Sequence, residues 1–185
     1  VIASGPTVGD ATTADDARAV IAAYGLDVPA SITAWLGHPA AETPKPGDPR
    51  LGHASCRLVA TPALSLQAAA EQCAADGFRP VVLGDRIEGE SREVAKVLGA
   101  IALSCAEHGA PAPPPCVVLS GGETSVTVRS EGRGGRNVEF LLGLALTLEG
   151  RAGITAIAGD TDGIDGSEDN AGALVDETTL ARARS

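Results

Sequence analysis

Short apolar runs rich in β-branched residues alternate along this sequence with longer segments whose apolar residues recur at helical spacing. Strands are expected at four such runs, 58–60, 80–83, 117–119 and 154–158. Helices are expected from Thr13 to Gly25, from Thr61 to Gly77, at 90–108 and at 137–148. The alternation predicts an α/β fold with helices flanking a sheet. Residues 126–128 alternate in polarity and follow the strand at 117–119 closely, which predicts a hairpin arm and hence a mixed sheet.

Local signals mark the helix ends and one junction. Thr13 and Asp16 have the spacing of a capping box, and Gly25 ends the apolar repeat that follows. Thr61-Pro62 predicts the start of a second helix. Four prolines within 37–50 predict an extended connector, so a domain junction is expected there or shortly before it.

Charge and composition argue against several classes of partner. The net charge is −10, with 14 basic and 24 acidic residues, so nucleic acid and anionic membranes would be repelled. No apolar run approaches the roughly 20 residues that span a bilayer. Four cysteines are widely spaced without a CxxC pair, which predicts reduced thiols in a cytoplasmic protein.

The beginning of the sequence is unusual. It contains no methionine and opens on Val1-Ile2-Ala3, which resembles the end of a buried strand. Because natural chains begin with methionine, we expect this sequence to be an internal piece of a longer protein.

Three glycine-flanked charged blocks each follow an apolar run, at the strand ends where open α/β sheets bind ligands. The blocks are Ser120-Gly121-Gly122-Glu123-Thr124, Gly132-Arg133-Gly134-Gly135-Arg136-Asn137 and Asp160-Thr161-Asp162-Gly163-Ile164-Asp165-Gly166. Together they predict a phosphoryl-transfer site.

The first block has two glycines that could turn backbone N–H groups toward an anion. Ser120, Gly121, Gly122 and Thr124 would then bind nucleotide or substrate, and Glu123 could bind a hydroxyl or a metal. The alternative is a tight turn between two strands, with Glu123 in solvent.

The second block precedes an expected helix. Free amides of the first helical turn, with the guanidinium groups of Arg133 and Arg136, could converge on phosphate oxygens. Gly134, Gly135 and Asn137 would complete this site. The block matches neither GxxxxGK[ST] nor GxGxxG, because Asn137 stands at the third glycine position. The alternative is a flexible surface loop.

The third block gathers three carboxylates on one turn, which suits Mg²⁺ and its preference for oxygen ligands. Asp160 and Asp162 are the expected ligands. An EF-hand is excluded, because Ile164 stands where the third ligand should be. The alternative is a solvated acidic loop with Asp-Gly turn chemistry.

At these residues the sequence resembles the class II glycerate kinases, a family with a C-terminal MOFRL-type domain. Its members have also been named hydroxypyruvate reductases and tartrate-utilisation proteins. The resemblance extends along nearly the whole chain. Besides the three blocks it includes Ser4-Gly5-Pro6-Thr7, Asp10, Thr12-Thr13, Thr43-Pro44-Lys45-Pro46-Gly47-Asp48, Leu83-Gly84-Asp85 and Glu88-Gly89-Glu90. Ala60-Thr61-Pro62-Ala63 departs from the usual Gly-Ser-Asn-Arg and is similar to the tartrate-utilisation branch.

This resemblance implies ATP- and Mg²⁺-dependent phosphorylation of D-glycerate to phosphoglycerate. The family's site lies between a Rossmann-like N-terminal domain and a smaller C-terminal α/β domain. Residues 1–45 would be the end of the first domain and the junction, and residues 46–185 the second domain, incomplete at its C-terminus. Most of the N-terminal domain would be missing, including a lysine thought to serve the site, so the chain alone is expected to be inactive.

Roles for the site residues follow from phosphoryl-transfer chemistry. Arg136 would stabilise charge on the transferring group or hold the glycerate carboxylate, Glu123 would orient a substrate hydroxyl, and Asp160 or Asp162 would hold Mg²⁺. One alternative is NAD(P)H-dependent hydroxypyruvate reduction, although the chain has no intact GxGxxG and no histidine placed as a proton donor. Another is a non-catalytic nucleotide-binding or assembly module with the leucine-rich helix as its interface.

Overall fold

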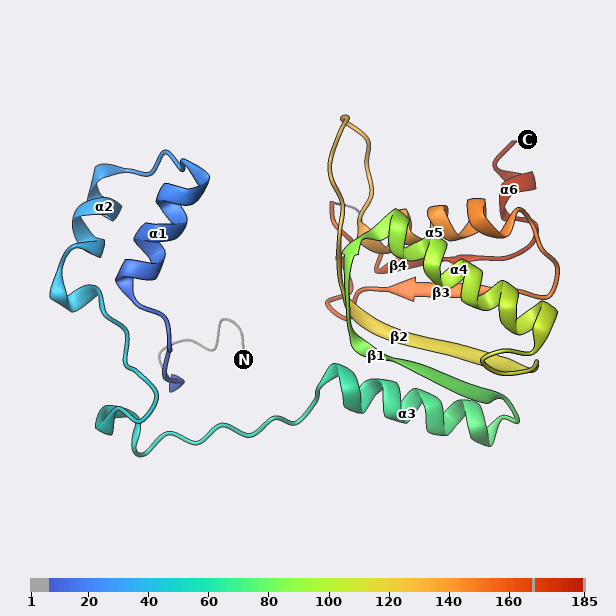
Figure 1. Cartoon of the computed structure of the whole chain (residues 1–185), viewed down its shortest axis with the longest axis horizontal. Helices are drawn as coiled ribbons and strands as arrows, with labels where there is room; N and C mark the ends of the chain where they lie inside the picture. Colours follow the sequence, from blue (N-terminus) through green and yellow to red (C-terminus); the bar gives the residue numbers. More distant parts are fainter. Residues whose placement is uncertain (1–6, 168, 185) are drawn as a thin grey trace. The chain divides into compact units, whose positions relative to one another are not determined.

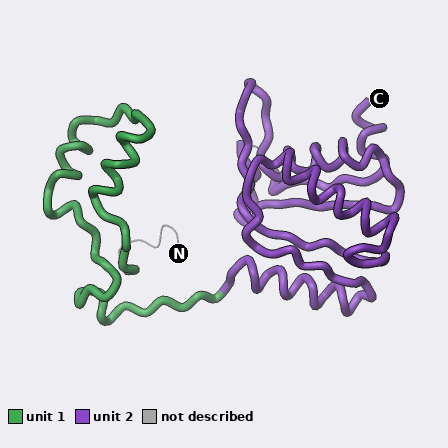
Figure 2. Tube along the Cα trace, in the orientation of Figure 1, with its two compact units in different colours: residues 1–59 green, residues 60–185 purple. Residues whose placement is uncertain are grey.

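The computed structural model describes residues 7–167 and 169–184. Two compact units are present, residues 1–59 and 60–185, which we call unit 1 and unit 2 (Figure 2). The expected strand end at residues 1–3 and the motif at residues 4–6 lie outside the described residues. The assignment of residues 1–45 and 46–185 to two domains remains a prediction.

Unit 1 contains two α-helices, α1 (Ala14–Tyr24) and α2 (Ala30–Leu36). The capping box is confirmed, because the Thr13 hydroxyl accepts the N–H of Asp16 and the Asp16 carboxylate accepts the N–H of Thr13. Gly25 ends α1 in the left-handed conformation, with φ of 57°. Neither helix buries a residue.

The expected extended connector at 37–50 is wrong. This segment contains two 3₁₀ turns, η2 (Pro39–Ala41) and η3 (Pro49–Leu51), each with a proline that presets φ at its start. The segment also turns back on the chain, since the Pro44 carbonyl accepts the N–H of Asp10 at 2.8 Å.

The expected strand at 58–60 is also wrong. Residues 54–60 have no regular secondary structure, and the side chains of Leu58 and Val59 are exposed. A strand needs a hydrogen-bonded neighbour, and the described part of the chain pairs none with this segment.

Unit 2 alternates helices and strands, as the sequence predicts (Figure 1). Its elements are α3 (Pro62–Ala75), β1 (Arg79–Glu90), α4 (Ser91–His108), β2 (Cys116–Ser125), α5 (Arg136–Leu148), β3 (Ala156–Gly159), β4 (Gly172–Val175) and α6 (Thr179–Arg182). Within the described ranges, no helix combines the length and the apolar character needed to cross a membrane.

The strands form two small sheets of opposite kind. β1 and β2 are parallel, with Arg79 opposite Cys116 and Glu90 opposite Ser125. β3 and β4 are antiparallel, with Gly159 opposite Gly172. Figure 1 shows β1 and β2 between α3 on one side and α4 on the other. The fold is therefore α/β with parallel and antiparallel pairing and flanking helices.

Both parallel strands continue beyond their expected ends. The expected strands at 80–83 and 117–119 run on to Glu90 and Ser125, through glycines that suggested turns. Two register shifts, between Val82 and Gly84 and between Gly84 and Ile87, absorb the irregular backbone as bulges. The expected strand at 126–128 is wrong, because the chain has left the sheet there and enters an irregular loop.

α5 supplies most of the core of unit 2. Leu141, Leu144, Ala145 and Leu148 are buried on one face of this helix, with Ala95 of α4 and Val175 of β4 against them. Leu142 and Leu146 of the same helix are exposed. Burial of this leucine-rich helix is therefore confined to one face.

Leu141→Ala is expected to lower the free energy of unfolding by about 2–5 kcal/mol, because a side chain with no exposed surface leaves a cavity when truncated. The matched control is Leu142→Ala, at the next and half-exposed position, which should cost less than about 1 kcal/mol. Urea unfolding followed by circular dichroism measures both. Equal losses would show that α5 does not turn its Leu141 face inward.

Candidate functional site

A cavity of about 700 Å³ lies in unit 2 where five segments meet. These are the start of α4, the end of β2, the loop 126–135, the first turns of α5 and the turn 160–166 after β3. Each of the three charged blocks contributes to its wall, through Thr124, Gly132–Arg136, Asp160, Asp162 and Gly166. Blocks that are distant in sequence therefore line one cavity, while their functional roles remain predictions.

Arg136 joins the three blocks. It is the first residue of α5, and its Nη1 donates to Glu123 Oε1 of β2 at 2.8 Å. Its Nη2 and Nε both donate to Asp160 Oδ2, at 2.6 and 3.2 Å. The Asp160 side chain is 9% exposed and that of Glu123 is 75% exposed, so Asp160 is the firmer of the two partners.

These contacts shift the titration of both charged groups. The hydrogen bonds that the Arg136 guanidinium donates, first to Asp160 and then to Glu123, raise its pKa above the usual value. The backbone N–H of Asp162, followed by Arg136, holds the pKa of the Asp160 carboxyl below its usual value. Arg136 therefore stays a cation, and Asp160 stays ionised to a lower pH than an ordinary aspartate.

Because folding depresses the pKa of Asp160, its contribution to stability is present above the unfolded pKa of about 3.9 and is lost as the pH falls through the folded pKa. We expect the unfolding free energy of Asp160→Asn to fall less steeply than that of the wild type between about pH 5 and about pH 2.5. Urea titrations at stepped pH measure the two slopes. Parallel curves would contradict this role.

The first block lies in β2 and makes no turn. Ser120 pairs with Gly84, Gly122 with Ile87 and Glu123 with Glu88 of β1. Residues 120–124 therefore form neither the expected anion nest nor the alternative tight turn, because they are part of a paired strand. Within the described chain Ser120, Gly121, Gly122 and Glu123 do not line the cavity, whereas Thr124 does.

Two amides in the first turn of α5 are not free for a phosphate. The N–H groups of Asn137 and Val138 donate to the two oxygens of Asp165, at 3.0 and 2.8 Å. The Asn137 side chain also donates to Asp165, at 3.1 Å. The expected phosphate cradle at this helix start is therefore already occupied by a carboxylate of the protein. Arg133, Gly134 and Gly135 still line the cavity.

The acidic block does not form a cage for Mg²⁺. Asp160 Oδ2 receives the guanidinium of Arg136, and Oδ1 accepts the N–H of Asp162 at 3.0 Å. Asp165 caps α5, and Asp162 is exposed. Among the described residues no three His, Cys, Asp or Glu side chains are grouped to hold a metal ion. Asp160 does not fit as a metal ligand in this arrangement.

Two polar residues near the cavity, Glu90 and Arg92, were assigned no role from the sequence. Glu90 accepts the N–H of Thr127 at 3.1 Å and its hydroxyl at 2.8 Å, and these bonds lower the pKa of Glu90. They fix the start of the loop 126–135. Arg92 lines the cavity, and its buried Nε makes no hydrogen bond in the described structure. The register of β1 on β2, which places Glu90 opposite Ser125, could have revealed the role of Glu90.

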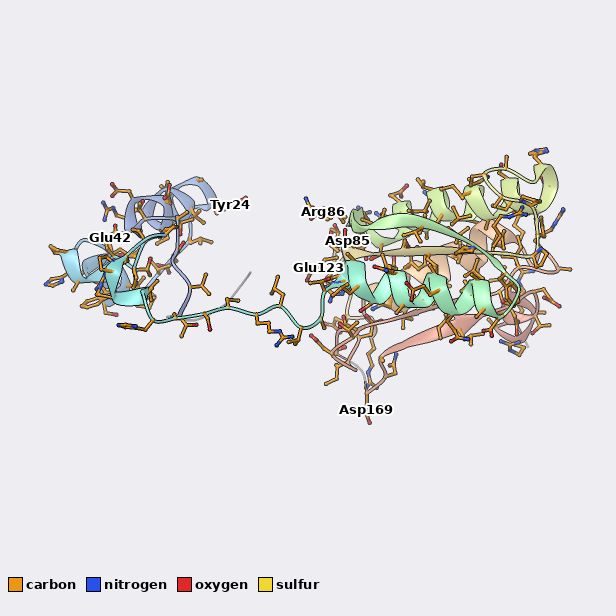
Figure 3. The ribbon with its side chains drawn as sticks, turned by 90° about the horizontal axis from the view of Figure 1, so that it is seen from below. Tyr24, Glu42, Asp85, Arg86, Glu123 and Asp169 are labelled. Carbon is orange, nitrogen blue, oxygen red and sulfur yellow. The ribbon has the colours of Figure 1, made fainter. Side chains whose placement is uncertain are left out.

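The same end of the sheet carries two further charged residues. Figure 3 shows Asp85 and Arg86 of β1 beside Glu123 of β2. A Cβ on Gly121, in the neighbouring strand, would lie 3.7 Å from the Cα of Asp85. The motif at 83–85 thus lies next to the first charged block.

Comparison with known proteins gives consistent relatives. Residues 116–185 match the MOFRL family, and residues 1–37 match a domain of unknown function, DUF4147. A protein of Agrobacterium vitis named "Putative hydroxypyruvate reductase" is 54% identical over 185 residues, covering 99% of this chain and 41% of that protein. The "Glycerate 2-kinase" of Pyrococcus horikoshii is 36% identical, covering 99% of this chain and 42% of that protein.

A solved structure agrees. The crystal structure of the glycerate kinase of Thermotoga maritima matches all of this chain with a TM-score of 0.77 and 31% identity, and the match covers 43% of that protein. The chain therefore spans about two fifths of the length of these three relatives.

Proposed function

We propose that this chain, which belongs to the family of the glycerate kinases and the proteins named hydroxypyruvate reductases, is part of an ATP-dependent kinase that phosphorylates D-glycerate. The observation that carries the proposal is Arg136, held by Glu123 and Asp160 at the wall of a cavity that all three charged blocks line. The names of the relatives indicate which reaction such a site would serve.

The charges around the cavity suit phosphoryl transfer, in which the protein mainly positions the reactants and neutralises charge. Arg92, Arg129, Arg133 and Arg136 all line it. The exposed Glu123 is the partner that a phosphate oxygen or the glycerate carboxylate would displace from Nη1 of Arg136. Asp160 would meanwhile keep the guanidinium in place. Once released, Glu123 is free to accept a hydrogen bond from a glycerate hydroxyl.

ATP and Mg²⁺ belong to this proposal as the phosphoryl donor and its metal. Since Asp160 is engaged by Arg136, the magnesium would be carried mainly by the phosphates of the nucleotide and by water, as is usual for this ion. Asp162, exposed at the cavity wall, is the remaining candidate ligand of the expected pair. The four cysteines, all free, are in keeping with a cytoplasmic location.

Hydroxypyruvate reduction is the second candidate, because the Agrobacterium vitis relative carries that name. The two activities consume different cofactors. Oxidation of NADH or NADPH with hydroxypyruvate, without formation of ADP, would support the reductase.

The decisive experiment joins this chain to the remaining length that its relatives possess and measures ADP formation with D-glycerate and MgATP. Glycerate-dependent ADP above the ATPase background is the expected result. Absence of ADP in a folded protein would end the kinase proposal. Nucleotide binding without turnover of any substrate would favour a non-catalytic module.

The 185-residue chain by itself is expected not to turn over, because a site that lacks part of its wall cannot align the nucleophile with the phosphoryl group. The purified chain and the restored protein are compared in the same coupled assay. Glycerate-dependent ATP consumption by the chain alone would refute this expectation.

A further inference from the structure

Asp165 is a buried carboxylate to which the reaction assigns no role. Its side chain has no exposed surface, and only Ser91 is a similarly buried polar residue in the described chain. It accepts the N–H groups of Asn137 and Val138 and one N–H of the Asn137 amide. Its own N–H donates to the Asn170 carbonyl at 2.7 Å. Both carboxylate oxygens are therefore committed to the start of α5.

The start of α5 depends on this distant residue. The first N–H groups of a helix lack partners within the helix and are usually capped by the side chain just before it. That position is Gly135, which has no side chain to offer. A Cβ on Gly135 would lie 2.4 Å from the carboxyl carbon of Asp165. The close approach of Asp165 to Gly135 leaves no room for a capping side chain at position 135. It also places the Asp165 carboxylate where it can cap the helix instead.

Gly166 completes the contact from the other side. Its φ is +70°, and a Cβ there would lie 2.4 Å from the Gly134 carbonyl oxygen. Two glycines, one in each segment, therefore let the turn 160–166 press against the loop before α5.

We infer that Asp165 is a positioning residue that locks the first turn of α5 and thereby fixes Arg136 against the cavity. Arg136 is the first residue of that turn, immediately before the two amides that Asp165 holds. Asp160 lies five positions before Asp165 in the turn 160–166, and it binds the guanidinium of Arg136. One short segment thus restrains Arg136 at its backbone and at its charged end. The catalytic consequence rests on the proposed kinase function.

The kinetic test is a double-mutant cycle in the restored full-length protein, with Asp165→Asn, Arg136→Lys and the combination. The asparagine amide cannot accept the N–H that the second oxygen receives, so Asp165→Asn is expected to lower kcat by about tenfold or more while changing each KM by less than about threefold. In the Arg136→Lys background the same change should cost less than about threefold, because the group being positioned is already altered. Equal losses in both backgrounds would overturn the inference.

A second measurement tests the contact without activity. In the wild type, the amides of Asn137 and Val138 should exchange hydrogen at least about tenfold more slowly, relative to their intrinsic rates, than those of Arg92 and Glu93. The latter occupy the same two positions in α4, which has no side-chain cap. Similar protection at the two helix starts would overturn the inference even if Asp165→Asn failed to fold.

The matched control is Asp169→Asn, an exposed carboxylate of the following loop, labelled in Figure 3. It should leave kcat and the exchange of Val138 unchanged, whereas Asp165→Asn should abolish the protection of Val138. Unchanged protection in Asp165→Asn would contradict the contact. If the restored protein forms no ADP, the proposed function fails, while the exchange result still decides the role of Asp165.

Discussion

Arg136→Ala is expected to lower kcat of the restored full-length enzyme on the order of a hundredfold or more. The guanidinium is the cation that the three charged blocks share, and charge that develops during transfer would lose its nearest counter-charge. Arg136→Lys should recover only part of the loss, because a point charge cannot replace a fork that binds Glu123 and Asp160 at once. Steady-state kinetics measures the series, with circular dichroism to establish folding.

Two controls accompany this series. Arg133→Ala should hurt less, because Arg133 lies between glycines at the outer end of the loop and outside α5. Arg151→Ala removes an arginine beyond the far end of α5, paired with Glu107, and should leave kcat unchanged. A near-wild-type kcat for Arg136→Ala would return the second block to a surface loop.

Gly122→Ala is expected to cost more than about 4 kcal/mol of unfolding free energy and to threaten the folding of unit 2. Gly122 has φ of 152°, and a Cβ there would lie 2.0 Å from the carbonyl oxygen of Ile87 and 2.4 Å from its nitrogen. These are backbone atoms of the paired strand, so they can move only if the β1–β2 ladder opens.

The matched control for this substitution is Gly84→Ala in the neighbouring strand. Gly84 has φ of 118°, but nothing lies within 4 Å of its would-be Cβ. It should therefore pay only backbone strain, about 1–3 kcal/mol. Urea unfolding of both variants separates clash from strain, and equal losses would show that β2 does not approach β1 as closely at Gly122.

Elements with local signals were predictable from the sequence. The capping box at Thr13, the left-handed Gly25 and the Thr61-Pro62 start each act over a few residues, and the helices they mark are confirmed. The lengths of β1 and β2 were not predictable, since their glycine-containing halves are strands only by pairing with each other. Without that pairing, the glycines look like turns.

The site divides in the same way. The charged blocks stood out by composition, and the cavity gathers residues from all three. The different roles of the carboxylates could not be predicted from composition. Asp160 and Asp165 differ only in which distant group each of them contacts. One faces a guanidinium 24 positions away, and the other faces amides 27 and 28 positions away. Spacing within the block suggested a metal site, whereas the guanidinium that Asp160 binds and the helix amides that Asp165 binds both lie outside the block.

The hold on Arg136 at both ends also has an entropic consequence. An arginine side chain has about 2 kcal/mol of rotamer entropy to lose when it is immobilised. Here most of that loss falls on folding, because Asp160 orders the guanidinium before any ligand arrives. A substrate would then meet a pre-organised fork and give up less of its binding energy to ordering the protein. Weakening the contact between Asp160 and the Arg136 guanidinium should therefore make the entropy of substrate binding more unfavourable. Calorimetry can measure this change.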